Sequence, residues 1–478
     1  MKKFKKIFAV LLTLAMVLGM SMTSFAANLT NGSFKVTGLK PDDTAIVSYA
    51  QILEQDEAGN WKFTDAADGK LTWNDGTDMT VKSLTGTTAP LKNLNGLANL
   101  TYSNPKVATG GTVTFDNLPA GLYAVKALDA NNQYVYSYMI AKIDYDNGKL
   151  VGSELTAKVQ ENIPEKTPST TSVVPGEVVT FTVKVNYPTF ATGSTEKKME
   201  IVDTVTNGKI VEDSVTISDE FADLFGTPSV TEEGTKLTIS LNADAYDSSK
   251  AGQQVVITYN VKADDSIYNA VENRVISKVP TQDGTDTANQ AIVKLPNVSA
   301  EITKVDEKDA VITSSTATFE LYKADPNGAA TIKVYDKSNP DGTEIKATLV
   351  GTQITKNGKV TFTGLDPDPE KATYYVKETV APNGYAVEPL ARKLTGATLT
   401  ANTGAPVNNN GVWTTTTEYT ATNFDGLEGF NGTKFVNTKL GSLPSTGGIG
   451  TTIFTIGGCA IMIIAAALFF ASRRKSSK

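Results

Sequence analysis

Short runs in which apolar and polar residues alternate dominate this chain, and they restrict it to folds built from β-strands. The clearest runs are 181–187, 255–261 and 317–321. Because successive residues of a strand face opposite sides, a period of two indicates antiparallel sheets with one buried face. Gly, Asn, Asp and Pro interrupt the runs, and no long amphipathic helix is evident. We therefore expect an all-β chain made of β-sandwiches in series.

The N-terminus has the layout of a secretory signal peptide. Four of residues 2–6 are lysine, and residues 7–20 are apolar. Ser24 and Ala26 then offer small side chains at a cleavage site. This order is typical of an export signal that is removed from the mature protein. We predict that residues 1–26 are the signal peptide and that the mature chain begins at Ala27.

The other end carries a short motif, an uncharged stretch and a basic tail. The motif consists of Leu443, Pro444, Ser445, Thr446 and Gly447. Residues 451–472 carry no charge, and about 20 apolar residues suffice for a transmembrane helix. The basic residues 473–475 fit the cytoplasmic side of a membrane. In this order the three features resemble the cell-wall sorting signal of Gram-positive bacteria. In that family a sortase cysteine cuts between the Thr and the Gly, and an amine then takes the Thr.

Composition excludes several classes of function. Removing residues 1–26 and 447–478 deletes eight basic residues and no acidic ones, which leaves 36 basic against 51 acidic residues. Such an acidic balance argues against nucleic acid as a partner. The chain has no histidine, which excludes Ser-His-Asp and Cys-His catalysis and argues against a zinc site. The single cysteine, Cys459, lies in the C-terminal apolar stretch, so the mature chain can form no disulfide. We expect neither a metal nor a cofactor.

Length and composition divide the mature chain into three domains. Residues 27–446 number 420, which is about three domains of ordinary size. Residues 161–174 are rich in Pro, Ser and Thr and resemble a linker, and residues 294–299 mark a second junction. The expected divisions are an N-terminal β-sandwich at 27–160, two further β-sandwiches at 161–296 and 297–440, and the sorting signal at 441–478.

An internal repeat relates the first expected domain to the third. Residues 113–118 match residues 360–365, and a strand pattern follows each of them. Where the third domain has Glu378, the first has Ala127. Residues 378–385 resemble the E-box of collagen-adhesin B-type domains. In that family the Glu promotes a spontaneous isopeptide bond between a Lys on the first strand and an Asn on the last strand. The resemblance assigns these roles to Glu378, Lys304 and Asn437.

The pleat of the strands supports that assignment. Each of the three polar residues shares a strand face with an apolar residue two positions away, in the pairs Lys304 and Ile302, Glu378 and Val376, Asn437 and Phe435. Burial lowers the pKa of a lysine and raises that of a glutamate, which favours a neutral amine and a protonated acid. A neutral amine can attack the Asn side-chain carbon while the acid moves protons as ammonia leaves.

The domain at 161–296 looks like the related A-type domain, in which an Asp takes the role of the Glu. Asp203 and Asn273 each lie within a run that places apolar residues on the same face. Lys166 is the expected lysine of this domain, because it precedes the strand that starts near Val178. The first domain has Ala127 at the E-box position, so we predict no cross-link of this kind there.

Over the whole chain, these features resemble the major (backbone) pilin of sortase-assembled Gram-positive pili, with tandem Ig-like β-sandwiches of the collagen-adhesin A and B types. In that family a pilin sortase joins the Thr of one subunit to a Lys of the next, usually in a Tyr-Pro-Lys motif that is absent here. Lys158 lies at the corresponding place, with Thr156 and Gln160 expected on the same solvent face. Lys166 is the alternative acceptor.

The resemblance also implies partners and a location. The implied partners are a class C pilin sortase, a housekeeping sortase, further copies of this chain, accessory pilins, peptidoglycan and host surface ligands. The chain would be secreted and anchored to the cell wall, with transient membrane retention through the C-terminal helix. Formation of the internal bonds is autocatalytic and occurs once per site, so we do not expect an enzyme.

Three alternatives stay open on the sequence. A monomeric wall-anchored adhesin shares every feature except the acceptor lysine, and an accessory pilin would occupy the tip or base of a fibre. A secreted enzyme without histidine would need a carboxylate pair, as glycoside hydrolases have, and no candidate pair is found. Residues 144–148 hint at a calcium loop, but they are incomplete against that motif and more typical of a tight turn.

Overall fold

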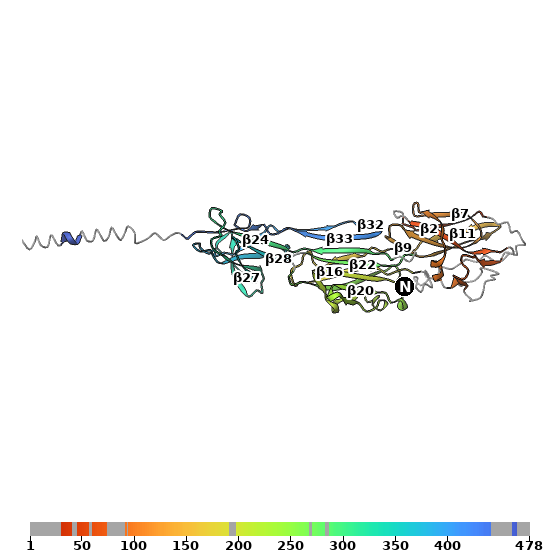
Figure 1. Ribbon diagram of the computed structural model, residues 1–478, viewed down its shortest axis with the longest axis horizontal. Coiled ribbons are helices and arrows are strands. Elements are labelled where there is room, and N and C mark those ends of the chain that lie inside the picture. The colour runs from red at the N-terminus through yellow and green to blue at the C-terminus, as the bar shows by residue number, and fades with distance from the viewer. Residues whose placement is uncertain are drawn as a thin grey trace, which may run out of the picture. The chain divides into compact units, whose positions relative to one another are not determined.

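The computed structural model describes residues 30–440, except 41–44, 57–59, 74–90, 93, 191–196, 267–269 and 283–285, together with 461–465. The predicted signal peptide, the motif at 443–447 and most of the predicted membrane helix lie outside the described residues. The chain divides into two compact units (Figure 1). The first unit holds the residues up to 298 together with 363–371 and 397–423, and the second holds 299–362, 372–396 and the residues from 424 onward.

Strands dominate both units, as the alternating pattern predicts. The described helices are the 3-10 helices Leu94–Asn99, Glu212–Ser214, Ala222–Leu224, Glu232–Gly234, Ala243–Ala245 and Ser248–Lys250, and a helical stretch at 461–465. Among the described residues, no helix combines the length and the apolar character that crossing a membrane requires.

The N-terminal part of the first unit is a β-sandwich. One sheet has the strand order β12-β1-β7, and the other has the order β11-β10-β8-β2-β3 with β6 beside β2. Two small pairs, β13-β9 and β4-β5, complete it. The bounds are β1 (Gly32–Thr37), β2 (Ala45–Gln55), β3 (Trp61–Phe63), β4 (Thr72–Trp73), β5 (Leu91–Lys92), β6 (Ser103–Val107), β7 (Val113–Leu118), β8 (Gly121–Asp129), β9 (Tyr134–Tyr136), β10 (Met139–Asp146), β11 (Lys149–Gly152), β12 (Glu154–Thr156) and β13 (Val159–Glu161).

The middle part of the first unit is a second sandwich. Its smaller sheet has the order β14-β15-β21-β17 with β18 beside β21, and its larger sheet has the order β19-β20-β16-β22-β23-β33-β31 with β32 beside β33. The bounds are β14 (Glu165–Pro168), β15 (Val178–Asn186), β16 (Glu200–Thr206), β17 (Gly208–Ile210), β18 (Thr216–Ile217), β19 (Ser229–Thr231), β20 (Lys236–Ser240), β21 (Gln254–Ala263), β22 (Val271–Lys278), β23 (Asn289–Leu295), β31 (Leu399–Thr403), β32 (Val407–Asn409) and β33 (Val412–Ala421).

The core of the middle sandwich follows from the period of two. The odd-numbered residues of β15 and of β21 are buried from Val179 to Val185 and from Val255 to Ala263. The two strands pair in antiparallel register, with Phe181 opposite Tyr259. The residues between them on the other face are partly or fully exposed. The predicted one-sided burial of these strands is therefore confirmed.

Two expectations about residues 156–174 are wrong. The composition of residues 161–174 predicts a linker, but β14 lies within this segment and pairs with β15, and Val173 is buried. Gln160 was expected on the solvent face, but it is buried and its amide is bound at both ends. The amide donates to the carbonyl of Asn186 at 3.1 Å and accepts from the backbone N–H of Thr189 at 3.0 Å. A polar side chain with both partners in reach can be buried against the simple alternation.

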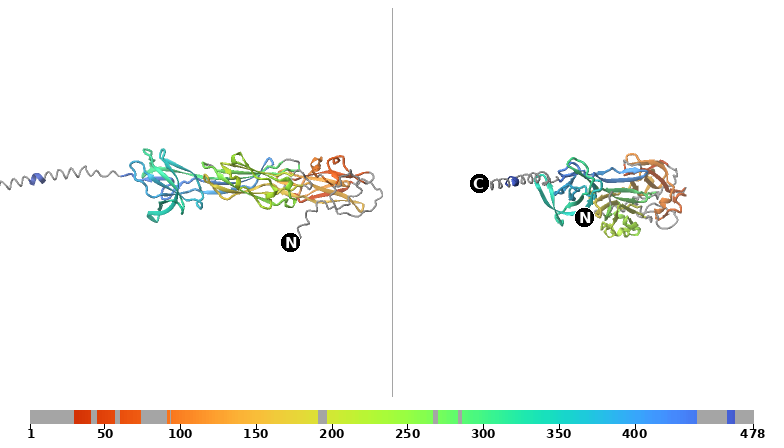
Figure 2. Two further views of the ribbon diagram at one scale, coloured as in Figure 1. Left: turned by 90° about the horizontal axis from the view of Figure 1, so that it is seen from below. Right: turned by 60° about the vertical axis from the view of Figure 1, so that its left-hand side comes forward.

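Strand β33 belongs in sequence to the third expected domain, yet it extends the middle sheet. It pairs in parallel with β23, from Gln290 opposite Thr414 to Lys294 opposite Glu418. In Figures 1 and 2 the blue strands of this hairpin lie beside the green strands of that sheet. The segment also reaches the N-terminal sandwich, where the Trp413 indole N–H donates to the carbonyl of Asn131 at 2.7 Å. The sequence pattern did not indicate this pairing.

The second compact unit is a third sandwich. Its sheets have the orders β28-β24-β35 and β26-β27-β25-β29-β30-β34. The bounds are β24 (Val298–Asp306), β25 (Thr318–Ala324), β26 (Ala330–Asp336), β27 (Asn339–Ile354), β28 (Lys359–Leu365), β29 (Tyr374–Val380), β30 (Arg392–Thr395), β34 (Gly426–Leu427) and β35 (Lys434–Asn437). The first strand, β24, pairs in parallel with the last, β35. Phe319 and Phe435 meet edge to face between the sheets, with ring centroids 4.9 Å apart.

Candidate cross-linking sites

The second unit buries three polar side chains on three different strands. Lys304 lies on β24, Glu378 on β29 and Asn437 on β35, and each is at most 1% exposed. Each follows an apolar core residue two positions away on its own strand, so the pleat turns all three into the sandwich. The structure brings together the three residues that the sequence singled out for this domain.

The carboxyl group of Glu378 contacts both of the other side chains. The Nδ2 atom of Asn437 donates to Glu378 Oε2 at 2.7 Å, and the Nζ atom of Lys304 lies 3.5 Å from Glu378 Oε1. The backbone N–H of Glu388 also donates to Glu378 Oε2, at 3.0 Å. Lys304 Nζ donates to the carbonyl of Phe435 at 2.8 Å. The amine and the amide are thus held beside one acid.

Burial shifts the protonation of this site toward its neutral form. Desolvation lowers the pKa of Lys304 to about 8, against the opposing effect of Glu378. Desolvation also raises the pKa of Glu378, although Lys304 and Asn437 oppose that shift. Two buried acceptors, Glu378 Oε1 and Asn437 Oδ1, have no hydrogen-bond partner among the described residues. Buried acceptors without a partner are costly in a core.

The middle sandwich holds a second buried set. Lys166 lies on β14, Asp203 on β16 and Asn273 on β22, and all three are buried. The side chain of Lys166 has no exposed surface, and its Nζ donates to Asp203 Oδ2. Asp203 Oδ1 has no hydrogen-bond partner within the described part of the chain. The residues predicted from the A-type resemblance therefore also lie together.

Sequence reasoning missed one residue of this second set, Tyr259 on β21. Its hydroxyl lies 2.5 Å from Lys166 Nζ, 2.5 Å from Asp203 Oδ2 and 3.2 Å from Asn273 Nδ2. The sequence placed Tyr259 in an alternating run as a core residue only. Its neighbours on that face, Ile257 and Val261, are aliphatic, and a buried Tyr hydroxyl normally needs a polar partner. That need was a signal that could have identified it.

Burial dominates the electrostatics of this set as well. Desolvation lowers the pKa of Lys166 to about 8, with Asp203 opposing, and it raises the pKa of Asp203, with Lys166 opposing. Desolvation and the nearby Asp203 raise the pKa of Tyr259 well above its usual range. Because its pKa is raised, the hydroxyl of Tyr259 keeps its proton. The Nζ atom of Lys166 also lies over the rings of Phe181 and Tyr259, 5.3 and 5.2 Å from their centroids.

Lys158 lies between β12 and β13 with an exposed side chain. Its carbonyl accepts the backbone N–H of Ser137 at 3.1 Å, which fixes the main chain at this point. Partial burial lowers the pKa of its amine. Thr156 is exposed, as expected, and Ala157 is buried between them. Ala127, at the E-box position of the first domain, is a buried residue of β8 whose side chain offers no acid.

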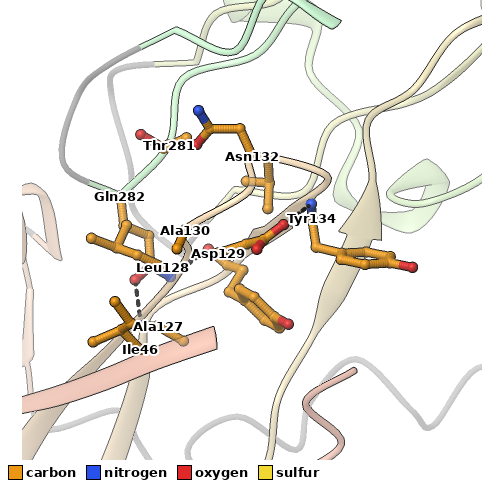
Figure 3. Close-up of a pocket in the computed structure, with 11 residues that line it drawn as sticks. Ile46, Ala127, Leu128, Asp129, Ala130, Asn132, Tyr134, Thr281 and Gln282 are labelled. Atoms are coloured by element: carbon orange, nitrogen blue, oxygen red, sulfur yellow. Dashed lines mark hydrogen bonds between the residues drawn. The ribbon is translucent and has the colours of Figure 1, made fainter. Parts of the chain in front are cut away.

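A cavity of about 290 Å³ lies between β8, the β8–β9 turn and Gln282 (Figure 3). Gln282 Oε1 accepts the backbone N–H of Ala127 at 3.0 Å. The carboxylate of Asp129 accepts the backbone N–H groups of Asn131, Gln133 and Tyr134 at 2.7–3.0 Å. These contacts hold the turn together, and the lining residues that the structure describes include no pair of an acid and a base. The described residues contain no group of three side chains suited to hold a metal ion.

Two family models match parts of the chain. Residues 436–478 match the LPXTG cell wall anchor motif, and residues 298–393 match a prealbumin-like fold domain. The anchor match covers the motif, the apolar stretch and the basic tail that the sequence identified.

One curated relative and two solved structures are similar over most of the chain. The trypsin-resistant surface T6 protein of Streptococcus pyogenes serotype M6 is 24% identical over 422 residues, which cover 74% of each chain. The structure of the T6 backbone pilin of serotype M6 Streptococcus pyogenes superposes with a TM-score of 0.56 at 16% identity, covering 86% of this chain and 99% of that one. The full-length major pilin SpaD of Corynebacterium diphtheriae gives a TM-score of 0.47 at 20% identity, over 76% and 90% of the two chains. The T6 superposition shows a shared fold.

Proposed function

We propose that this chain is the structural subunit of a covalently polymerised pilus on a Gram-positive cell surface, anchored to the cell wall and supporting adhesion. The observation that carries the proposal is the LPXTG anchor match at residues 436–478, which begins on the last strand of the second unit. The fold shared with the T6 backbone pilin over 86% of the chain supports it. The buried Lys, acid and Asn sets in two sandwiches fit a subunit that carries tension.

The polymer forms by acyl transfer at the sorting motif. A class C pilin sortase cleaves between Thr446 and Gly447 and holds the Thr446 carbonyl as a thioester. The amine of Lys158 on another copy attacks that carbonyl, and the sortase cysteine leaves. An exposed side chain on a fixed main chain suits Lys158 for this role. Lys166 suits it poorly, because its side chain is fully buried and its amine is bound to Asp203.

The buried sets form internal isopeptide bonds without an enzyme. In the second unit, the neutral amine of Lys304 attacks Cγ of Asn437, the new C–N bond forms, and the C–Nδ2 bond breaks. Glu378 gives a proton to the amide and takes one from the attacking nitrogen, so ammonia leaves and Glu378 is restored. Asp203 serves as the acid for Lys166 and Asn273 in the middle sandwich. The contacts that support this are those of Glu378 and of Asp203 with their partners.

The cross-links serve mechanical strength. A fibre one molecule wide passes tension through every subunit, and hydrogen-bonded strands can be separated one after another. A covalent tie between β24 and β35 joins the first strand of the unit to its last. It also restricts the unfolded chain as a long-loop disulfide does, which corresponds to about 4–5 kcal/mol for a loop of this size.

A housekeeping sortase then attaches the finished fibre to peptidoglycan, and the C-terminal helix holds each subunit in the membrane until cleavage. Accessory pilins and host surface ligands are the remaining partners of the proposal. A monomeric wall-anchored adhesin would carry the same anchor but would not form chains of itself.

Wall extracts of the producing cell test the proposal. Boiled denaturing gels should show a ladder of high-mass species that contain this chain. Thr446→Ala should abolish the ladder, and Thr438→Ala, outside the sorting motif, should leave it unchanged. A single wall-linked band in the wild type would favour the monomeric adhesin and contradict the pilus.

A further inference from the structure

We infer that the hydroxyl of Tyr259 relays protons between Asp203 and Asn273 and is a catalytic group of the middle-sandwich cross-link. This inference rests on the proposed isopeptide bond between Lys166 and Asn273. It explains how an Asp does in one sandwich what a Glu does in the other.

The two sites differ in how the acid reaches the amide. In the second unit, Glu378 Oε2 lies 2.7 Å from Asn437 Nδ2, a direct hydrogen bond. In the middle sandwich, the described residues show no hydrogen bond between Asp203 and Asn273. The two acids also stand in different places. Glu378 faces Asn437 from the opposite sheet, whereas Asp203 lies on the strand beside that of Asn273, two residues out of register with it. An aspartate is also one methylene shorter than a glutamate, which limits its reach toward the amide.

The hydroxyl of Tyr259 fills that gap. It lies 2.5 Å from Asp203 Oδ2 on one side, and 3.2 Å from Nδ2 and 3.5 Å from Oδ1 of Asn273 on the other. It also accepts from Lys166 Nζ at 2.5 Å. All of these atoms are buried, so water does not offer an alternative route. Tyr259 is the one described side chain that contacts the amine, the acid and the amide together.

A hydroxyl can carry a proton in this position because it donates and accepts at once. When Asp203 is protonated, its proton passes to Tyr259 Oη while the Tyr259 proton passes to the amide oxygen of Asn273. The amine of Lys166 attacks Cγ in the same step, and the C–N bond forms. On collapse, a proton of the attacking nitrogen passes through Asp203 and Tyr259 to Nδ2, the C–Nδ2 bond breaks and ammonia leaves. The proton on the amide oxygen returns through Tyr259 to Asp203 as the carbonyl re-forms, so both side chains end as they began.

The ring of Tyr259 has a separate packing role. It stacks on Phe181 with centroids 6.1 Å apart and planes 20° apart. A Tyr259→Phe variant keeps this ring and removes only the hydroxyl. A loss of cross-linking in that variant therefore reports on the proton relay and not on the packing of the core.

Time-resolved intact-mass spectrometry of the newly synthesised mature chain tests the inference. Each bond removes the mass of one ammonia, and peptide mapping assigns it to Lys166–Asn273 or to Lys304–Asn437. In Tyr259→Phe the first bond should form about 100-fold more slowly, within the range for loss of general acid–base help. The Lys304–Asn437 bond of the same molecule should form at the wild-type rate, which shows that the chain is folded.

Tyr187→Phe is the matched control, because Tyr187 is a buried tyrosine of the same core whose hydroxyl binds the backbone N–H of Asp247. It should form both bonds normally. In the double variant Asp203→Glu with Tyr259→Phe, the longer acid should reach Asn273 directly and recover much of the rate. Recovery would support the relay, and failure to recover would contradict the distance argument.

The outcomes separate this inference from the proposal beneath it. If the wild type forms no Lys166–Asn273 bond at all, the proposed cross-link fails and the relay with it. If the wild type forms the bond and Tyr259→Phe forms it equally fast, the cross-link stands and the relay is overturned.

Discussion

Asn437 lies two residues beyond Phe435, the residue directly opposite Lys304 in the parallel pair of β24 and β35. A step of two keeps Asn437 on the face toward which Lys304 points. The amine and the amide thus come from neighbouring strands that are far apart in sequence. A bond between them closes almost the whole second unit into one covalent loop.

The first prediction concerns mass. The mature chain should lack the mass of two ammonia molecules. Glu378→Ala and Asp203→Ala should each restore one, because each removes the acid of one site. Intact-mass spectrometry of the purified protein measures this, with Glu301→Ala as the control, since that side chain is exposed and pairs with Lys359. A full unmodified mass in the wild type would contradict both internal assignments.

The second prediction concerns stability. Asn437→Ala removes the bond and the restriction that it places on the unfolded chain, so the second unit should lose about 4–5 kcal/mol of unfolding free energy. Lys304 then also keeps a buried amine without its amide partner, which adds to the loss. Calorimetry of the mature chain should show a lower transition for this unit and an unchanged transition for the first. An unchanged melting curve would show that the Lys304–Asn437 cross-link does not stabilise this unit.

The third prediction concerns pH. Burial lowers the pKa of Lys304 from 10.5 to about 8. The Asn437→Ala chain cannot form the bond, so it keeps this amine free and buried. Between these values the unfolded chain binds more protons than the folded one, so the contribution of this group to stability rises with pH. It is lost as the pH falls through about 8. Denaturant unfolding from pH 7 to 10 measures this rise, and a matched Lys304→Met, Asn437→Ala chain should lack it. Equal slopes in the two variants would contradict the burial of a free amine.

The fourth prediction concerns the acceptor lysine. Lys158→Ala in the producing cell should abolish the high-mass ladder, because no amine remains at the acceptor position. Lys149→Ala, another exposed lysine of the same sandwich, should leave the ladder intact. Both variants should carry both internal bonds, since neither lysine belongs to the residues proposed to form them. A normal ladder in Lys158→Ala would move the acceptor to another lysine.

The fifth prediction concerns the hairpin that extends the middle sheet. Trp413→Phe keeps an aromatic ring and removes the indole N–H that binds Asn131. It should lower the unfolding free energy of the first unit by about 1 kcal/mol, the usual net value of one hydrogen bond. Thermal unfolding followed by circular dichroism measures this, with Trp61→Phe as a comparison for a tryptophan of the N-terminal core. No change in Trp413→Phe would show that the indole bond does not secure the hairpin.

The sequence predicted those parts of the molecule that depend on local pattern. Period-two runs located β15 and β21, and residues two apart on a strand located Lys304, Glu378 and Asn437 on a buried face. These inferences need only the pleat of a strand and the cost of burying polar groups.

The pairing of strands that are far apart in the chain could not be predicted from the sequence. Nothing in residues 412–421 indicates β23 as a partner, because a threonine-rich strand fits many sheet edges. Gln160 is buried where the alternating pattern predicts an exposed side chain. The groups that bind its amide, the carbonyl of Asn186 and the backbone N–H of Thr189, are distant in sequence, so the pattern could not reveal them. Tyr259 was missed for a similar reason: its role depends on which three strands surround it.

Peptide mapping of polymers from the cell wall tests the central claim most directly. The account predicts a branched peptide in which the carbonyl of Thr446 is bonded to the side-chain amine of Lys158 from another copy. Polymers that contain no such branch at Thr446, or a chain found only uncut or linked singly to peptidoglycan, would contradict it.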